Sequence, residues 1–214
     1  MTHVAAFDVD GTLTVRDCVV PFLERVAGRG NLGLAMMRQP SGVIAAALHR
    51  DRDRMKAVAV RAAFRGRDAH EVEALGVAFA DEIHTGWLRP DTPQRLAWHQ
   101  RQGHQVVLVS ASLGPYLRPL GRLLGVDGVL CTNAIVGNDG RYSGELAGAN
   151  CRGPEKARLL REWLHERGLD NAELWAYGDS AGDRELLSLA HHHFYVKGKV
   201  VTPAPSSAEQ GLPT

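Results

Sequence analysis

Residues 7–14 read Phe-Asp-Val-Asp-Gly-Thr-Leu-Thr and close the short apolar run of residues 4–7. A short apolar run that ends in turn-forming residues is typical of a strand buried on both faces of a parallel sheet. Asp8 follows the run directly, and Asp10 comes two residues later. Gly11 permits a tight turn in which backbone N–H groups approach an anionic ligand. The stretch therefore predicts a buried strand with a carboxylate-rich loop at its carboxyl end.

Three more short apolar runs follow along the chain, at residues 106–109, 174–177 and 194–196. Between them lie stretches in which leucine and other apolar residues recur at helical spacing, namely residues 92–102, 116–124, 155–167 and 184–190. Strands that alternate with helices imply right-handed crossovers and a sheet covered on both faces. The sequence thus predicts an α/β fold with a doubly wound, mostly parallel sheet.

Residues 16–87 interrupt this alternation, because their apolar residues recur at helical spacing and no strand pattern is visible. We expect a helical cap here, inserted after the first strand, with an α/β core formed by residues 1–15 and 88–200. Residues 134–143 place a Gly-Asn-Asp-Gly turn between two short strand patterns, which predicts a β-hairpin. Residues 201–214 are rich in proline and serine and are predicted to form a disordered tail.

Composition excludes several classes of protein. The 214 residues are 44% hydrophobic and 23% charged, as in ordinary globular proteins. The net charge of +1 and the aromatic content of 6% argue against a nucleic-acid partner. Three cysteines without a Cys-x-x-Cys pair predict neither a zinc site nor a disulfide framework. The N-terminus lacks a signal-peptide pattern, and no apolar stretch approaches the roughly 20 residues of a membrane span. We expect a cytoplasmic protein, either a monomer or a homodimer.

Acidic and hydroxyl side chains follow three of the predicted strands: Asp8, Asp10, Ser110 and Asp179. Ligands of open α/β sheets bind outside the carboxyl ends of the strands, so these side chains should converge there. Asp183 lies about one helical turn after Asp179 and can face the same point. Clustered carboxylates repel one another unless a cation lies among them, and an all-oxygen ligand set favours magnesium. Magnesium beside carboxylates points to phosphoryl transfer.

The two aspartates after the first strand suit different chemical roles. A carboxylate can attack phosphorus and form an aspartyl-phosphate, and Asp8 is the candidate nucleophile. Asp10 can protonate the leaving alcohol and then activate water. Asp-x-Asp-Gly also opens calcium-binding loops, but such a loop needs Glu at position 19, where this chain has Val19.

Other residues can bind the phosphoryl group. Ser110 can offer its hydroxyl, and backbone amides can reach phosphate oxygens at Ala111 beside it and at Gly11 in the first loop. Lys156, near the start of a predicted helix, can neutralise charge on the nucleophile and the phosphoryl group. Taken alone, each of these residues also fits an ordinary turn, cap or solvated helix position. Their placement at successive strand ends favours a shared site.

These residues also carry a family resemblance. Residues 7–14, 109–112, Lys156 and residues 178–183 resemble the four motifs of the haloacid dehalogenase superfamily. Aspartate at both positions of the first motif is the phosphatase version. The helical insert between the first and second motifs is similar to the cap of the phosphoserine-phosphatase-like branch, also called family IB hydrolases. The resemblance extends from residue 4 to about residue 196.

The resemblance implies a role for each motif residue. It makes Asp8 the nucleophile and Asp10 the acid and base. It assigns Mg²⁺ to Asp8, Asp179 and the backbone carbonyl of Asp10, with Asp183 ordering the metal shell. Phosphate binding falls to the serine and the lysine named above.

The residues expected to hold the substrate match that branch less well. Phosphoserine phosphatases use a Glu nine residues after the nucleophile and a cap Arg, and here these positions are Asp17 and Arg61. Asp17 can equally cap the first cap helix, and Arg61 can equally be a solvated surface residue. The second motif, Ser-Gly-Gly in that branch, reads Ser-Ala-Ser at residues 110–112, and Gly182 replaces the usual Asn before the last Asp. These departures speak against phosphoserine itself.

The sequence therefore predicts a magnesium-dependent phosphomonoesterase acting through an aspartyl-phosphate. Its substrate is expected to be a small phosphorylated metabolite, similar to phosphoserine or histidinol phosphate. A phospholipid head-group or lysophospholipid phosphatase is the alternative within the enzyme class. A non-catalytic, phosphate-responsive switch is the alternative outside it, and the presence of both Asp8 and Asp10 argues against that reading.

Overall fold

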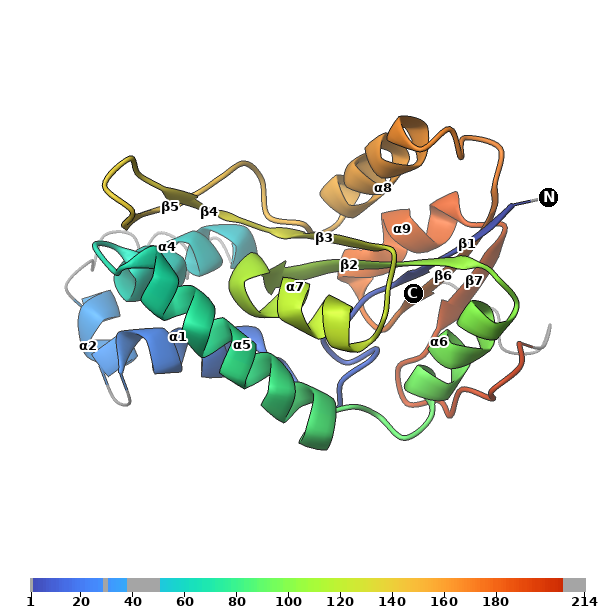
Figure 1. Cartoon of the computed structure of the whole chain (residues 1–214), viewed down its shortest axis with the longest axis horizontal. Coiled ribbons are helices and arrows are strands. Elements are labelled where there is room, and N and C mark those ends of the chain that lie inside the picture. Colours follow the sequence, from blue (N-terminus) through green and yellow to red (C-terminus); the bar gives the residue numbers. More distant parts are fainter. Residues whose placement is uncertain (1, 29–30, 38–50, 206–214) are drawn as a thin grey trace.

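The computed structural model describes residues 2–28, 31–37 and 51–205. Its main sheet has five strands in the order β3-β2-β1-β6-β7, and every neighbouring pair is parallel (Figure 1). The strands are β1 (His3–Phe7), β2 (Gln105–Leu113), β3 (Gly128–Thr132), β6 (Glu173–Gly178) and β7 (His192–Tyr195). The predicted parallel α/β sheet is confirmed, with the first strand at its centre.

Helices cover both faces of this sheet, which explains why its strands are continuously apolar. Ala5 and Phe7 of β1 belong to one core cluster, which includes residues of α6 (Thr92–Arg101) and α7 (Gly114–Leu123). The alternate residues Val4 and Ala6 belong to a second cluster with α8 (Pro154–Glu166) and α9 (Arg184–Leu189). A short 3₁₀ turn, η1 (Ala181–Asp183), leads into α9.

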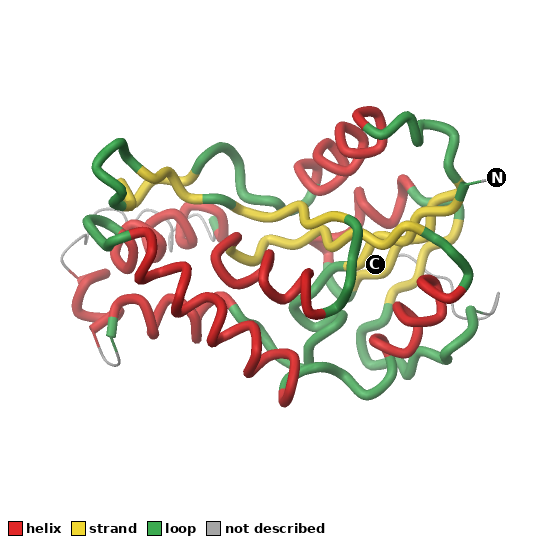
Figure 2. Tube along the Cα trace, in the orientation of Figure 1, coloured by secondary structure: helices red, strands yellow, loops and turns green. Residues whose placement is uncertain are grey.

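Four described helices lie between β1 and α6: α1 (Val19–Ala27), α2 (Asn31–Met37), α4 (Arg52–Phe64) and α5 (Ala69–Gly86). They gather at one end of the molecule, beyond the carboxyl end of β2 (Figures 1 and 2). Helix α5 packs against α7 so closely that a Cβ at Gly76 would collide with the carbonyl of Pro115. Phe22, Phe79 and Tyr116 join the cap helices to α7 in one aromatic cluster.

The two chain segments that connect the cap to the core run side by side. Thr14 and Leu88 form an antiparallel bridge. The N–H of Val15 donates to the carbonyl of Trp87, and the N–H of Arg89 donates to that of Leu13, both at 2.9 Å. The cap is therefore attached to the core through a short pair of hydrogen-bonded linkers next to the loop that follows β1.

Of two further β elements, the sequence predicted the hairpin but not the edge strand. The predicted hairpin is present as β4 (Ala134–Val136) and β5 (Tyr142–Leu146), and it packs against α4. Strand β3 was not predicted. It is the edge strand of the sheet, its first three residues are only half-buried, and its apolar run is short. An edge strand needs no long apolar run, because neighbours cover less of its surface.

The predicted disorder of residues 201–214 is wrong for the first of these residues. Val201 is buried, and its N–H donates to the carboxylate of Asp91 at 2.8 Å. The guanidinium of the buried Arg95 donates to the carbonyls of Thr202 and Ala204. Composition could not show that α6 and its N-cap residue Asp91 supply these polar partners for the tail. Residues 206–214 lie outside the described residues.

Among the described residues, none of the helices combines the length and the apolar character that crossing a membrane requires.

Candidate active site

The carboxyl ends of β1, β2 and β6 meet at a cavity of about 460 Å³, which helices α1 and α4 of the cap close from the other side. The structure brings most of the predicted site residues to its wall: Asp8, Asp10, Asp17, Ser110, Ala111, Lys156, Asp179 and Asp183. Gly11 and Arg61 do not line the cavity. Parallel strands place their carboxyl ends at one edge, which is why distant segments of the sequence converge there.

Lys156 is held by two carboxylates at the bottom of the site. Its ammonium donates to Asp8 Oδ1 and to Asp183 Oδ1, both at 2.5 Å, and all three side chains are buried. Although burial opposes the charge, the two carboxylates raise the pKa of Lys156 above its usual range. Thr12 donates its hydroxyl to the other oxygen of Asp8 at 3.0 Å. Lys156 therefore stays protonated beside the candidate nucleophile.

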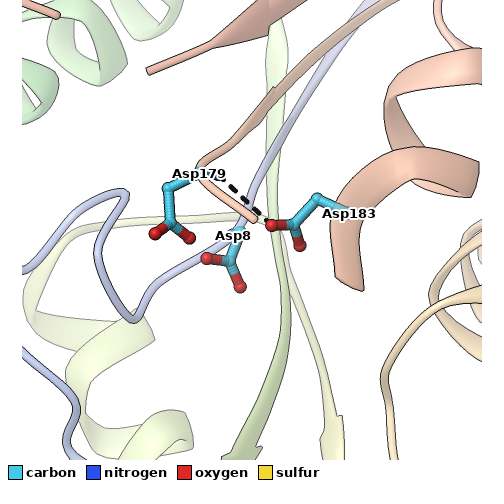
Figure 3. A group of neighbouring side chains, drawn as sticks. All are labelled: Asp8, Asp179 and Asp183. Carbon is cyan, nitrogen blue, oxygen red and sulfur yellow. Dashed lines mark hydrogen bonds between the residues drawn. The ribbon is translucent and has the colours of Figure 1, made fainter. Parts of the chain in front are cut away.

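Asp8, Asp179 and Asp183 form an acidic group in which one oxygen of each lies within 4.8 Å of the others (Figure 3). Burial, with the nearby charge of Asp183, raises the pKa of Asp8 to about 8 and that of Asp179 to about 6. Three clustered carboxylates with a single ammonium among them leave excess negative charge. An oxygen-only group of this kind fits a hard divalent cation.

Asp183 also orders the loop that carries Asp179. Its Oδ2 accepts from the backbone N–H of Asp179 at 3.2 Å (Figure 3) and from the N–H and hydroxyl of Ser180 at 3.0 and 2.9 Å. Because the other oxygen of Asp183 accepts from Lys156, one buried carboxylate connects the loop after β6 with the base of the site. The capping-box contacts of η1 hold this arrangement locally.

Asp10 lies beside the acidic group but is held by different partners. Its Oδ1 accepts from the N–H of Cys18 at 2.8 Å, and its Oδ2 accepts from the hydroxyl of Ser112 at 2.7 Å. Burial and the charge of Asp17 raise the pKa of Asp10. A raised pKa suits a group that must carry a proton in one step and give it up in another.

The loop after β1 passes very close to the loop after β6. Gly11 has a φ of 84°, and a Cβ at this position would collide with the carboxylate of Asp179. Glycine is therefore needed here for both the backbone conformation and the close approach. Gly11 does not line the cavity but allows the two loops to approach each other, whereas Ser110 and Ala111 line the cavity.

The two residues expected to hold the substrate from the cap have other partners. Asp17 lines the cavity, but its Oδ1 accepts from the N–H of Val20 at 3.1 Å and so caps the start of α1. Arg61 pairs with Glu145 of β5 at 3.2 Å, and 43% of its side chain is exposed. Arg61 therefore lies on the hairpin side of α4, away from the cavity.

Lys56 is a residue of the cavity that sequence reasoning missed. From α4 its ammonium donates to Asn150 Oδ1 at 2.7 Å, to the hydroxyl of Thr132 at 3.2 Å and to the carbonyl of Ala111. Burial lowers the pKa of Lys56 to about 8. Helical spacing could have indicated its position, because Lys56 lies one turn before the buried Val60.

Arg152 is a second cation on the cavity wall that the sequence did not single out. It precedes α8 and passes close to Gly182, whose added Cβ would lie 3.0 Å from the Arg152 Nε. This contact gives a physical reason for the glycine that stands where the related branch has Asn: a side chain there would displace Arg152. The site thus presents two cations, Lys56 and Arg152, beyond the lysine that binds Asp8.

Comparisons with known proteins show which family the chain belongs to. The sequence model of the haloacid dehalogenase-like hydrolase family matches residues 5–188. Protein CicA of Caulobacter vibrioides is 37% identical over 193 residues, which are 90% of this chain and 85% of that protein. Phosphoserine phosphatase SerB1 of Mycobacterium tuberculosis is 31% identical over 197 residues, covering 88% of this chain and 63% of that protein.

A solved protein of unknown function from Bordetella pertussis has the same fold, with a TM-score of 0.72 at 22% identity over 91% of this chain and 90% of that one. The family match covers every strand-end residue that lines the cavity, from Asp8 to Asp183. The chain therefore belongs to the haloacid dehalogenase-like hydrolase family.

Proposed function

We propose that this hydrolase is a phosphomonoesterase in which Asp8 forms an aspartyl-phosphate. The observation that carries the proposal is the buried Asp8–Lys156–Asp183 group, which opens onto a cavity that also receives Asp10. A buried carboxylate held by an ammonium, with a second carboxylate beside it, supplies both a nucleophile and a proton donor. The phosphatase named among the relatives supports the same reaction class.

The reaction follows from the positions of these groups. The carboxylate of Asp8 attacks phosphorus, the bond from phosphorus to the alcohol oxygen breaks, and Asp10 gives a proton to that departing oxygen. Lys156 and the hydroxyl of Ser110 bind the phosphoryl oxygens and stabilise the charge that develops on them. In the second step Asp10, now a carboxylate, takes a proton from water, which attacks the aspartyl-phosphate and releases phosphate. Asp10 is restored to its acid form.

Mg²⁺ is the cation that we propose for the acidic group. Asp8 and Asp179 would hold it, with the carbonyl of Asp10, and Asp183 is near enough to serve as a further ligand. When bound, it would neutralise the clustered carboxylates and polarise a phosphoryl oxygen.

The cavity favours a small alcohol as the leaving group. Beside Lys56 and Asp17, its cap side carries an apolar surface formed by Val19, Val20, Leu23, Met55 and Ala59. We propose a small phosphorylated metabolite whose carbon chain lies against this wall. Because the same apolar surface can contact an acyl chain, a phospholipid head-group or lysophospholipid phosphatase activity stays the second candidate.

Turnover by the purified protein tests this proposal. The protein should release phosphate from p-nitrophenyl phosphate with Mg²⁺, lose that activity in chelator and regain it when Mg²⁺ is restored. Calcium should substitute poorly, because it takes more ligands at longer distances. Phosphoserine, histidinol phosphate and micellar lysophosphatidate then separate the candidate substrates. Full activity in excess chelator would contradict the metal assignment, and inactivity on every ester would contradict the proposed function.

A further inference from the structure

We propose that Lys56 is a positioning residue that reaches from the cap to orient Ser110 for phosphate binding. The proposal rests on the proposed function, since it concerns how the same site binds the phosphoryl group. It assigns Lys56 no direct contact with the leaving group.

The peptide between Ala111 and Ser112 connects Lys56 with Ser110. Lys56 donates to the carbonyl of Ala111, and the N–H of Ser112 donates to the Ser110 hydroxyl oxygen at 3.1 Å. The carbonyl and the N–H of a trans peptide point in opposite directions. The contact at one end therefore sets the direction of the N–H at the other.

The hydroxyl of Ser110 remains able to donate a hydrogen bond. Because its oxygen accepts from the N–H of Ser112, its own hydrogen is left to donate elsewhere. Ser110 is buried but lines the cavity, so a phosphoryl oxygen is the natural acceptor. An ammonium on the Ala111 carbonyl also polarises the peptide and strengthens its N–H as a donor.

Lys56 is held in place by Asn150. Asn150 is buried, and its Oδ1 accepts from Lys56 while its Nδ2 donates to Asp53 of the same helix at 2.7 Å. The hydroxyl of Thr132 also donates to the Asn150 Oδ1, at 2.8 Å. One core amide thus binds two neighbouring α4 side chains and aligns the cap helix with the 110–112 segment.

A competing role for Lys56 would be to bind an anionic group on the leaving alcohol. The two roles predict that Lys56 variants lose binding or activity toward different sets of ligands. A residue that acts through Ser110 affects every phosphoryl ligand equally, including inorganic phosphate. A residue that binds the leaving group affects only substrates that carry the complementary group.

The experiment uses Lys56→Met, which keeps the length of the side chain, with Lys56→Arg as the conservative variant. Arg54→Ala, which removes an exposed cation from the same helix, is the matched control. Inhibition by inorganic phosphate is measured together with kcat and KM for p-nitrophenyl phosphate and for alkyl phosphates with and without a carboxylate. Circular dichroism melts check that each variant is folded.

We expect Lys56→Met to weaken phosphate inhibition and to lower kcat/KM by about 10- to 100-fold, as for hydrogen bonds made by charged groups. The factor should be the same for all the esters, Lys56→Arg should recover part of it, and Arg54→Ala should match the wild type. Asp53→Ala should cause a smaller loss that adds little to that of Lys56→Met, because Asp53 acts on Lys56 through Asn150.

A loss confined to the carboxylate-bearing ester would overturn the proposal, and so would unchanged phosphate inhibition in a folded Lys56→Met protein. Either result in an active enzyme leaves the proposed function intact. A wild-type protein that turns over no ester contradicts the proposed function instead.

Discussion

The two walls of the cavity each carry a lysine, and the two lysines are held in opposite ways. On the core wall, Lys156 lies between the carboxylates of Asp8 and Asp183, which raise its pKa. On the cap wall, Lys56 has a carbonyl, a hydroxyl and an amide oxygen as its acceptors, and burial lowers its pKa to about 8. Neutral oxygens stabilise an ammonium less than carboxylates do, so desolvation dominates there.

The core wall and the cap wall therefore contribute differently to the site. The core wall is a charge-paired unit of Asp8 after β1, Lys156 of α8 and Asp183 of η1, and its ion pairs involve no cap residue. The cap wall depends on α4 being docked, because Lys56 and Asp53 reach across to the core residue Asn150. Substitutions on the core wall should therefore abolish turnover or slow it greatly, and substitutions on the cap wall should have smaller effects on its rate.

Asp8→Asn should have the largest effect. A neutral amide cannot form an aspartyl-phosphate, so turnover should vanish while the protein stays folded. Rapid-quench measurements with labelled substrate should find no hydroxylamine-sensitive phosphoenzyme. A phosphoenzyme of that kind in the variant would show that the nucleophile lies elsewhere and that the core wall has been misread.

Asp10→Asn should slow turnover by roughly 10²- to 10⁴-fold, the usual value of general acid–base catalysis. The burst of nitrophenol from p-nitrophenyl phosphate should fall less than phosphoenzyme formation from an alkyl phosphate, because nitrophenolate leaves without a proton. Breakdown of the phosphoenzyme should slow as well, since the attacking water loses its base. If both bursts fell equally, Asp10 would have a structural role, through its hydrogen bonds with Ser112 and Cys18, and no acid–base role.

Lys156→Met should lower kcat by roughly 10²- to 10³-fold, as removal of a preorganised donor does elsewhere. It should also reduce the free energy of unfolding by about 3–5 kcal/mol, because Asp8 and Asp183 would remain buried without a cation to balance their charge. Urea unfolding of Lys156→Met beside Lys56→Met sharpens the comparison. Lys56→Met leaves no buried carboxylate unpaired, so equal losses of stability in the two variants would contradict the distinction between the walls.

The activity that depends on Lys56 should decline as the pH rises through about 8. The ammonium is protonated below that pH and neutral above it, so the ratio of wild-type to Lys56→Met activity should fall toward one. This limb descends with pH, whereas ionisation of the nucleophile Asp8, which must be a carboxylate to attack, would give an ascending limb. Lys56→Arg should move the decline to higher pH, since a guanidinium keeps its proton. If the decline occurs at the same pH in Lys56→Arg, it reflects the titration of another group.

Arg61→Ala should have the smallest effect, a change in kcat/KM of less than about threefold on any ester. Exposed ion pairs such as Arg61–Glu145 contribute only about 0–1 kcal/mol, and this one lies outside the cavity. A large loss restricted to one natural substrate would show that Arg61 contacts that substrate.

The residues of the core wall could be predicted because local patterns carry them. Asp8, Ser110 and Asp179 each follow a short apolar run of the kind that predicts a buried strand, and parallel strands place their carboxyl ends together. Lys156 and Asp183 were predicted as contributors, but the sequence did not show that they bind each other. That contact joins the start of α8 to η1, and no local pattern sets the distance between those segments.

The cap wall could not be predicted in the same way. The resemblance to phosphoserine phosphatases placed a substrate-binding arginine at Arg61, whereas the rotation of α4 turns Lys56 toward the cavity and Arg61 toward β5. The sequence determined the fold class, the strand-end chemistry and the presence of a helical cap, because buried strands and amphipathic helices have distinct periods. Only the tertiary structure decided which face of α4 meets the core, because that depends on its packing against β5 and on the polar partners that Asn150 provides.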